Sequence, residues 1–208
     1  MYIPKHFRED DLNTLHNLIR EYSFATLITQ HEDTPFASHL PFILDAQRGQ
    51  NGTLLAHMAR ANPQWHDFVS EQEVLVIFQG PHAYISPSWY EVELSVPTWN
   101  YAVVHAYGIP RLIKDDEELF ELLQILIKTH EAQFENQWPF QLPDDYLQKM
   151  IRGIVGFEIE ITRLEGKFKL SQNRTESERE NVIASLQQSS DTLTIAELMK
   201  NRLLGTKS

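Results

Sequence analysis

The stretch "GPHAYISPSWYEVELSVPTWNYAVVHAYG" (residues 80–108) decides how this chain is interpreted. It contains two of the four Trp and four of the seven Tyr residues, and three prolines interrupt it. An ordinary core would use Leu, Ile and Val, because buried Trp and Tyr carry donors that need partners. The stretch therefore predicts a ligand surface or a subunit interface.

Several β-prone runs flank this stretch and predict a sheet. Residues 23–29, 35–44 and 52–58 are short runs joined by turn-like segments, which we interpret as an antiparallel meander. Residues 74–80, part of 82–90 and 98–113 are predicted as further strands, with the prolines confining the middle region to edges and loops. The last predicted strand, 153–170, alternates apolar residues at period two: Val155, Phe157, Ile159 and Ile161.

Helical patterns occur in five places. Residues 10–22 space Leu and Ile at helical intervals behind an Asp cap, and residues 62–70 begin with Asn62 as N-cap and Pro63 at the first helical position. Residues 115–135 begin with acidic side chains that complement the helix dipole, and a loop follows at 136–146. Thr175 and Thr194 each precede a Glu by three, which predicts two capping boxes for C-terminal helices.

These elements together predict a mainly β protein with added helices, built on a small β-barrel. The chain has 208 residues, of which 42% are hydrophobic and 23% charged, which suits one globular domain. We expect a single domain over residues 1–208, with the barrel and its inserted helices in 1–170 and a helical C-terminal extension in 171–208.

Charge and composition exclude several classes of function. The net charge of −11 disfavours direct DNA binding, because such binding rests on Lys and Arg neutralising phosphates. The absence of cysteine excludes disulfides, thiolate metal sites and a Cys nucleophile. The N-terminus "MYIPKHFRED" has no apolar segment and the longest apolar runs are too short to span a bilayer, so a cytoplasmic protein without membrane contact is expected.

Common catalytic motifs do not occur in the sequence. It contains no HExxH, GxSxG, Walker or GxGxxG pattern. The nine histidines are scattered without paired ligand spacing, so no metal site is predicted. His39 and His57 lie in predicted strands, where each can be either a ligand contact or a hydrogen-bonded core histidine.

Five motifs, in order, resemble the PaiB-like, FMN-binding negative transcriptional regulator family. The resemblance runs from residue 1 to about residue 205 and implies a split barrel similar to pyridoxamine-phosphate oxidase-like proteins. It also implies a homodimer, an FMN site between barrel and partner subunit, and negative regulation that does not require DNA contact. The motifs are "MYIPKHF" (1–7), "HMARANPQW" (57–65), "GPHAYISPSWY" (80–90), "VPTWNYAVVHAYG" (96–108) and "KFKLSQNR" (167–174).

An FMN site needs a place for the phosphate and flat walls for the ring system. The junction "HMARANP" offers the cation Arg60, a helix that begins after Asn62, and His57 as a further donor, so it is the predicted phosphate site. Trp99 is predicted either to contact the flavin ring system or to lie in the dimer interface. By analogy with split-barrel flavoproteins, further contacts are predicted from Ser38, His39, Leu40, Lys169, Ser171 and Gln172.

Two functions of different classes fit the sequence. The first is a flavin-binding regulator or sensor without sustained chemistry. The second is an FMN-dependent oxidoreductase similar to flavin reductases, in which the cofactor performs the redox step, so that no catalytic triad is expected. A haem-binding protein is a third alternative, with His82 or His105 as axial ligand. Whether the protein is an enzyme is left open by the sequence.

Overall fold

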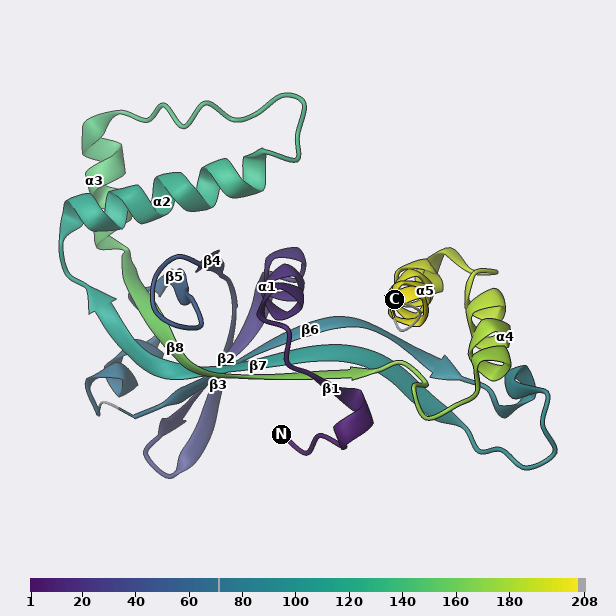
Figure 1. Ribbon diagram of the computed structural model, residues 1–208. Coiled ribbons are helices and arrows are strands. Elements are labelled where there is room, and N and C mark those ends of the chain that lie inside the picture. Colours follow the sequence, from purple (N-terminus) through teal and green to yellow (C-terminus); the bar gives the residue numbers. More distant parts are fainter. Residues whose placement is uncertain (71, 206–208) are drawn as a thin grey trace. The chain divides into compact units, whose positions relative to one another are not determined.

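The chain forms an antiparallel sheet accompanied by helices (Figure 1). The structure is a computed structural model, and it describes residues 1–70 and 72–205. The strands within these residues are β1 (Arg8–Glu9), β2 (Phe24–His31), β3 (Thr34–Pro41), β4 (Ile43–Asp45), β5 (Thr53–Ala59), β6 (Val74–Ile85), β7 (Thr98–Ile113) and β8 (Ile154–Lys169). The α-helices are α1 (Leu12–Glu21), α2 (Asp116–Glu131), α3 (Asp144–Arg152), α4 (Glu176–Leu186) and α5 (Leu193–Gly205), and the 3₁₀ helices are η1 (Lys5–Phe7), η2 (Pro63–Ser70), η3 (Pro87–Tyr90) and η4 (Ser190–Thr192).

The order of the strands in the sheet corrects the predicted meander. Neighbouring strands follow the order β3-β2-β6-β7-β8-β5-β4, and β1 pairs with β8. β2 and β3 do form a hairpin, with His31 opposite Thr34. β5, however, pairs with β8 and β4 rather than with β3. The predicted run 35–44 is thus divided into β3, which pairs with β2, and β4, which pairs with β5, so both antiparallel pairings of the meander form. The meander was wrong only as one continuous sheet, because β6, β7 and β8 lie between the two pairs and local turn chemistry does not encode such long-range pairings.

β6 is one continuous strand where the sequence predicted two. It runs through Pro81, a residue that usually stays out of central strands because it lacks an N–H donor. β2 pairs only with residues 75–77 of β6. Pro81 therefore lies beyond the region paired with β2, so its missing N–H costs no hydrogen bond to that strand.

The helices follow their predicted caps with two exceptions. Asp115 caps α2 by accepting hydrogen bonds from two backbone N–H groups, and Thr175 forms the predicted capping box with Glu178. The second predicted box was wrong, because α5 already begins at Leu193 and Thr194 lies inside the helix. Helix α3 was missed, since its first residues were assigned to the 136–146 loop. None of the described helices has the length and apolarity needed to cross a membrane.

The chain divides into two compact units, each with its own core. Unit 1 comprises residues 1–18, 79–105 and 165–208, and unit 2 comprises residues 19–78 and 106–164. In unit 1, helices α4 and α5 pack against each other (Figure 1). Val182 of α4 and Met199 of α5 are fully buried. In unit 2, Phe157 is fully buried and contacts the rings of Phe42 and Phe68. The predicted single domain, with its extension beginning at residue 171, stays a prediction.

Candidate functional site

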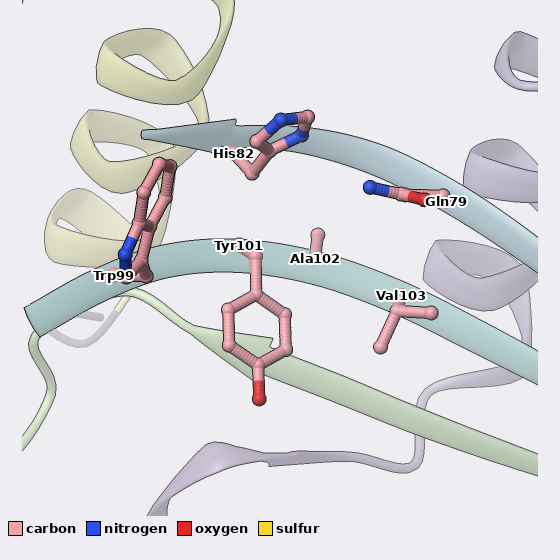
Figure 2. Close-up of a pocket in the computed structure, with 6 residues that line it drawn as sticks. All are labelled: Gln79, His82, Trp99, Tyr101, Ala102 and Val103. Carbon is pink, nitrogen blue, oxygen red and sulfur yellow. The ribbon is translucent and has the colours of Figure 1, made fainter. Parts of the chain in front are cut away.

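An open pocket in unit 1 lies on strands β6 and β7, and all but one of its lining residues belong to the aromatic stretch. Its volume is about 380 Å³, which is within the range of small-molecule sites. Figure 2 shows the six residues that line it, and we call this set the aromatic pocket. They are Gln79 and His82 from β6 and Trp99, Tyr101, Ala102 and Val103 from β7.

Strand alternation explains why large side chains gather there. Along β7, Asn100, Ala102 and Val104 are buried, so the residues between them point to the opposite face. Trp99 remains 53% exposed although its ring lies 6.2 Å from that of His82, centroid to centroid. An exposed indole beside an imidazole and a phenol offers a flat apolar wall with polar edges, as the aromatic stretch predicted.

Two lysines of β8 add positive charge near the aromatic pocket. The Nζ of Lys167 lies 5.3 Å from the centre of the Tyr101 ring, a cation–π distance. The Nζ of Lys169 donates to the carbonyl oxygen of Trp99 at 2.6 Å and to Thr98 Oγ1 at 2.5 Å. Neither lysine forms an ion pair with a carboxylate among the residues that the structure describes.

The environment of Lys169 would favour an anionic ligand. Burial lowers the pKa of its ammonium group, and the positive charges of Lys167 and Arg174 lower it further. In a protein with a net charge of −11, such a local concentration of cations is unusual. A phosphate bound there would relieve the repulsion between these groups.

Two other predicted contacts of unit 1, Ser171 and Gln172, are engaged in the turn after β8. Ser171 is 3% exposed, has a φ of 63°, and its hydroxyl lies 2.9 Å from the Nδ2 of Asn100. Gln172 accepts a hydrogen bond from the backbone N–H of Leu170 and donates one to the carbonyl of Phe168. The structure therefore gives both side chains partners within the protein.

In unit 2, Ser38 and Asn62 are brought together. The Nδ2 of Asn62 donates to the Ser38 hydroxyl at 2.9 Å, while its Oδ1 accepts from the backbone N–H of Gln64 at 3.0 Å, as an N-cap does. His39 is exposed on β3, where its Nδ1 lies 3.0 Å from the hydroxyl of Thr26. Leu40 is half-buried on the same strand, opposite Ala25.

Arg60 has a role that the sequence did not predict. Its Nε donates to the carbonyl of Arg152 at 2.8 Å, and its Nη2 donates to that of Ile154 at 2.7 Å. The Arg152 carbonyl lies at the C-terminal end of α3, where a cation complements the helix dipole, and the Ile154 carbonyl belongs to the first residue of β8. The guanidinium thus stabilises a helix that the sequence analysis had missed.

The predicted phosphate site at residues 57–62 stays a prediction, although three backbone N–H groups at 60–64 are already engaged. The backbone N–H groups of Arg60, Asn62 and Gln64 donate within the protein, and Pro63 has none. His57, the other residue of this predicted phosphate site, lies on β5 opposite Gly156. Its Nδ1 is buried without a hydrogen bond among the described residues, and burial lowers the pKa of its imidazole.

Sequence reasoning missed Lys167 and Gln79. Lys167 is separated from the predicted contact Lys169 only by Phe168, which is buried, so the period-two rule could have placed both lysines on one face. No comparable signal marks Gln79, because its place beside Tyr101 depends on the register of β6 against β7.

Comparisons with known proteins identify the family. The family described as "Putative FMN-binding domain" matches residues 1–163. The chain belongs to this family. Protease synthase and sporulation protein PAI 2 of Bacillus subtilis is 41% identical over 207 residues, which cover 98% of each chain. A protein of Emericella nidulans is 34% identical over 90% of each chain. The resemblance to PaiB-like regulators, drawn from five motifs, is confirmed.

Solved structures with a similar fold include flavin-binding proteins. The FAD and heme binding protein from Mycobacterium smegmatis has a TM-score of 0.62 at 13% identity, covering 84% of this chain and 78% of that one. Flavocytochrome Anf3 from Azotobacter vinelandii has a TM-score of 0.59 at 14% identity, covering 84% and 73%. The predicted split β-barrel with added helices is confirmed. The predicted cofactor FMN agrees with the description of the family as an FMN-binding domain.

The residues of unit 1 fit an FMN molecule. A flavin needs flat apolar walls, a few fixed polar groups and a cation for its phosphate. Trp99 and Tyr101 offer the walls, and His82 offers a polar edge. Lys167 and Lys169 offer positive charge for the phosphate. The positive charges of Lys167 and Arg174 repel that of Lys169, so an anion bound there would be stabilised.

Proposed function

We propose that this protein binds FMN at the aromatic pocket and acts as a flavin-dependent regulator. The observation that carries the proposal is the set of exposed aromatic side chains next to two lysines without carboxylate partners. In this arrangement Trp99 and Tyr101 would hold the isoalloxazine ring, and Lys167 and Lys169 would bind the phosphate. When bound, the flavin supplies electron or hydride transfer, and the residues of the chain bind and orient it.

We also propose that two copies of the chain associate through the exposed face of β6 and β7. Tyr84 and Trp99 are 48% and 53% exposed, and their rings lie 5.9 Å apart in an edge-to-face arrangement. Leu94 and Val96, in the segment between the two strands, are 89% and 69% exposed. Apolar exposure of this extent within one stretch of the chain supports a protein interface. A second copy would shield both the aromatic side chains and a flavin bound beside them.

The regulatory action is proposed to run through the flavin or a protein partner rather than through DNA. The name of the Bacillus subtilis relative refers to protease synthesis and sporulation, which supports a regulatory role. The net charge of −11 opposes binding to phosphate backbones. A protein of this kind, whose site holds a redox cofactor, could report the reduction state of the flavin to a partner.

Titration with FMN and riboflavin tests the proposed site. Trp99→Ala removes a ring wall and should weaken both ligands alike. Lys167→Met should weaken FMN about tenfold to a hundredfold and riboflavin little, because only FMN carries the phosphate that forms the charge-assisted contact. Quenching of flavin fluorescence measures both affinities.

Lys114→Met is the matched control, since Lys114 is exposed and lies in unit 2, outside the pocket. It should leave both affinities unchanged. Equal losses of affinity for FMN and for riboflavin in Lys167→Met would show that this lysine does not bind the phosphate. If the wild-type protein binds neither ligand, the proposed function is wrong.

A further inference from the structure

A groove of about 510 Å³ lies between helices α2 and α3 in unit 2. The two helices are neighbours in Figure 1, and both contribute residues to one hydrophobic core cluster. We call the set of residues that line it the α2–α3 groove. They are Asp116, Glu117, Phe120, Glu121 and Gln124 from α2 and Leu147, Gln148 and Ile151 from α3. None of them belongs to the aromatic pocket, which lies in unit 1.

The α2–α3 groove has an apolar floor and a polar rim. Phe120 and Leu147 are half-buried and Ile151 is buried, and these three side chains form the floor. The five polar residues of the groove are all exposed to solvent. Phe120 and Gln124 are four residues apart, as are Leu147 and Ile151, so the members of each pair lie on one face of their helix. Each helix therefore contributes one row of side chains to the groove.

The charge of the groove is strongly negative. Three of its eight lining residues are carboxylates, and none is Lys or Arg. Asp116, Glu117 and Glu121 form no ion pair with any other residue that the structure describes. Residues 115–152, which include both helices, contain nine Asp and Glu residues against three Lys and Arg residues, so this segment carries more than half of the net charge of −11.

Helix stability accounts for only part of this negative charge. Asp116 and Glu117 lie in the first turn of α2, where a carboxylate complements the helix dipole. Glu121 lies beyond the first turn, so the dipole gives no reason for a carboxylate at its position. Its place on the rim, above an apolar floor, instead suggests a role in recognising a cationic partner.

The open form of the groove favours a protein partner over a small molecule. A small-molecule site encloses most of its ligand and presents few polar groups, whereas most lining residues of this groove are polar and exposed. The negative charge opposes contact with nucleic acids and anionic lipids, and a second copy of this acidic chain would bring further negative charge to the groove. A helix with one apolar face and basic flanks matches both the floor and the rim.

We propose that the α2–α3 groove binds a basic amphipathic helix of a partner protein. Apolar residues of the partner, spaced three and four apart, pack on Phe120, Leu147 and Ile151, and its Lys or Arg side chains pair with Glu121 and the other carboxylates. From Asp116 to Gln124 the groove follows α2 for roughly 13 Å, which is the length of about two and a half helical turns. This binding goes beyond the proposed flavin binding and uses other residues.

A model peptide tests the groove in the full chain. The probe is a fluorescein-labelled peptide of about 18 residues, built from leucine and lysine with the leucines on one helical face. It should bind saturably and become helical on binding. Two control peptides should bind at least about tenfold more weakly: one has the same composition with its leucines spread around the helix, and the other has glutamate in place of lysine. Fluorescence anisotropy measures the affinities, and circular dichroism measures the helix content.

Glu121→Lys should weaken binding of the amphipathic peptide about tenfold, because a repulsion replaces an attraction at the rim. Glu180→Lys is the matched control. It makes the same charge change at an exposed position of α4 in unit 1, and should alter the affinity by less than about twofold. Gln148→Trp fills the groove from α3 without changing its charge and should abolish binding. If Gln148→Trp does not fold, the comparison of Glu121→Lys with Glu180→Lys decides alone.

Three results with the peptides would contradict the proposal. The wild-type protein could fail to bind the amphipathic peptide. The peptide with spread leucines could bind as tightly, which would mean that only charge attracts it. Glu121→Lys and Glu180→Lys could weaken binding equally, which would mean that the peptide responds to the overall acidity of the protein and not to the groove.

Two further measurements address other occupants of the groove. Competition by phenethylammonium with an affinity similar to that of the peptide would show a site for small organic cations instead. Loss of self-association in Glu121→Lys, measured by sedimentation velocity, would show that a second copy of the chain occupies the groove. FMN affinity should be unchanged in Glu121→Lys, so a failure of this proposal can be told apart from a failure of the flavin site.

Discussion

Asn100 and Ser171 join two strand ends inside unit 1. The Nδ2 of Asn100 donates to the hydroxyl of Ser171 at 2.9 Å and also lies 3.3 Å from the sulfur of Met199. Both polar residues are almost fully buried, at 0% and 3% exposure. This contact connects β7, which carries the aromatic pocket on its other face, with the turn that leads to α4.

Ser171→Ala should therefore destabilise the protein. The change leaves the buried amide of Asn100 without its hydroxyl partner, which costs about 1–3 kcal/mol of the free energy of unfolding. Urea denaturation measures the loss. The control Ser177→Ala, at an exposed position of α4, should change stability by less than about 0.5 kcal/mol. Equal stability of the two variants would contradict the structural role of Ser171.

Arg60→Ala should lower stability without altering the preference for FMN over riboflavin. Its hydrogen bonds to the end of α3 and to the start of β8 are lost, at a net cost of about 1 kcal/mol each. Chemical denaturation and the two flavin titrations measure these effects. A selective loss of FMN affinity would instead restore the original prediction that Arg60 binds the phosphate.

The ion pair between His31 and Asp67 should make stability depend on pH. The His31 Nδ1 lies 2.8 Å from an oxygen of Asp67, which raises the pKa of the imidazole above its ordinary value of 6.5, first by hydrogen bonding and then by charge. Because the folded-state pKa is the higher one, the stabilisation is full below pH 6.5 and is lost as the pH rises through the folded pKa.

His31→Gln should accordingly lower Tm most at acidic pH and little at alkaline pH. Thermal unfolding of both proteins between roughly pH 5.5 and 8.5 covers the window in which histidine titrates. His66→Gln, at an exposed histidine of η2, serves as control and should follow the wild-type curve. If the Tm difference between the two proteins is constant across this pH range, the ion pair is not its cause.

The proposed dimer should dissociate when a charge is placed on the aromatic face. Tyr84→Glu introduces a carboxylate among side chains that would be buried between the copies, where an unpaired charge costs several kcal/mol. Sedimentation velocity at micromolar concentration should show a dimer for the wild type and a monomer for the variant. Ile125→Glu, at an exposed position of α2, should remain dimeric. A monomeric wild-type protein would contradict the proposed dimer.

Direct DNA contact should be weak. The acidic chain offers few cations to a phosphate backbone, so no tight, salt-sensitive complex is expected at physiological ionic strength. Fluorescence anisotropy with labelled duplex DNA over a range of salt concentrations checks this. An affinity that is high and falls steeply with added salt would show that the regulator acts on DNA itself.

The sequence by itself determined the local features of this protein. The alternation of Val155 and Phe157 identified β8, and Asp115 and Thr175 marked the starts of α2 and α4. These signals involve residues within one turn or one strand, so neighbouring side chains decide them. The family, too, followed from five motifs in order, because a motif is a property of the sequence alone.

Only the tertiary structure decided which distant residues meet. The pairing of β5 with β8, the capping of α3 by Arg60 and the approach of Lys167 to Tyr101 each join segments far apart in the chain. Such contacts form because burying one strand face or satisfying one helix end requires a partner, and many segments could supply it in principle. The register that brings the lysines to the aromatic pocket is therefore fixed by packing of the whole sheet rather than by any local pattern.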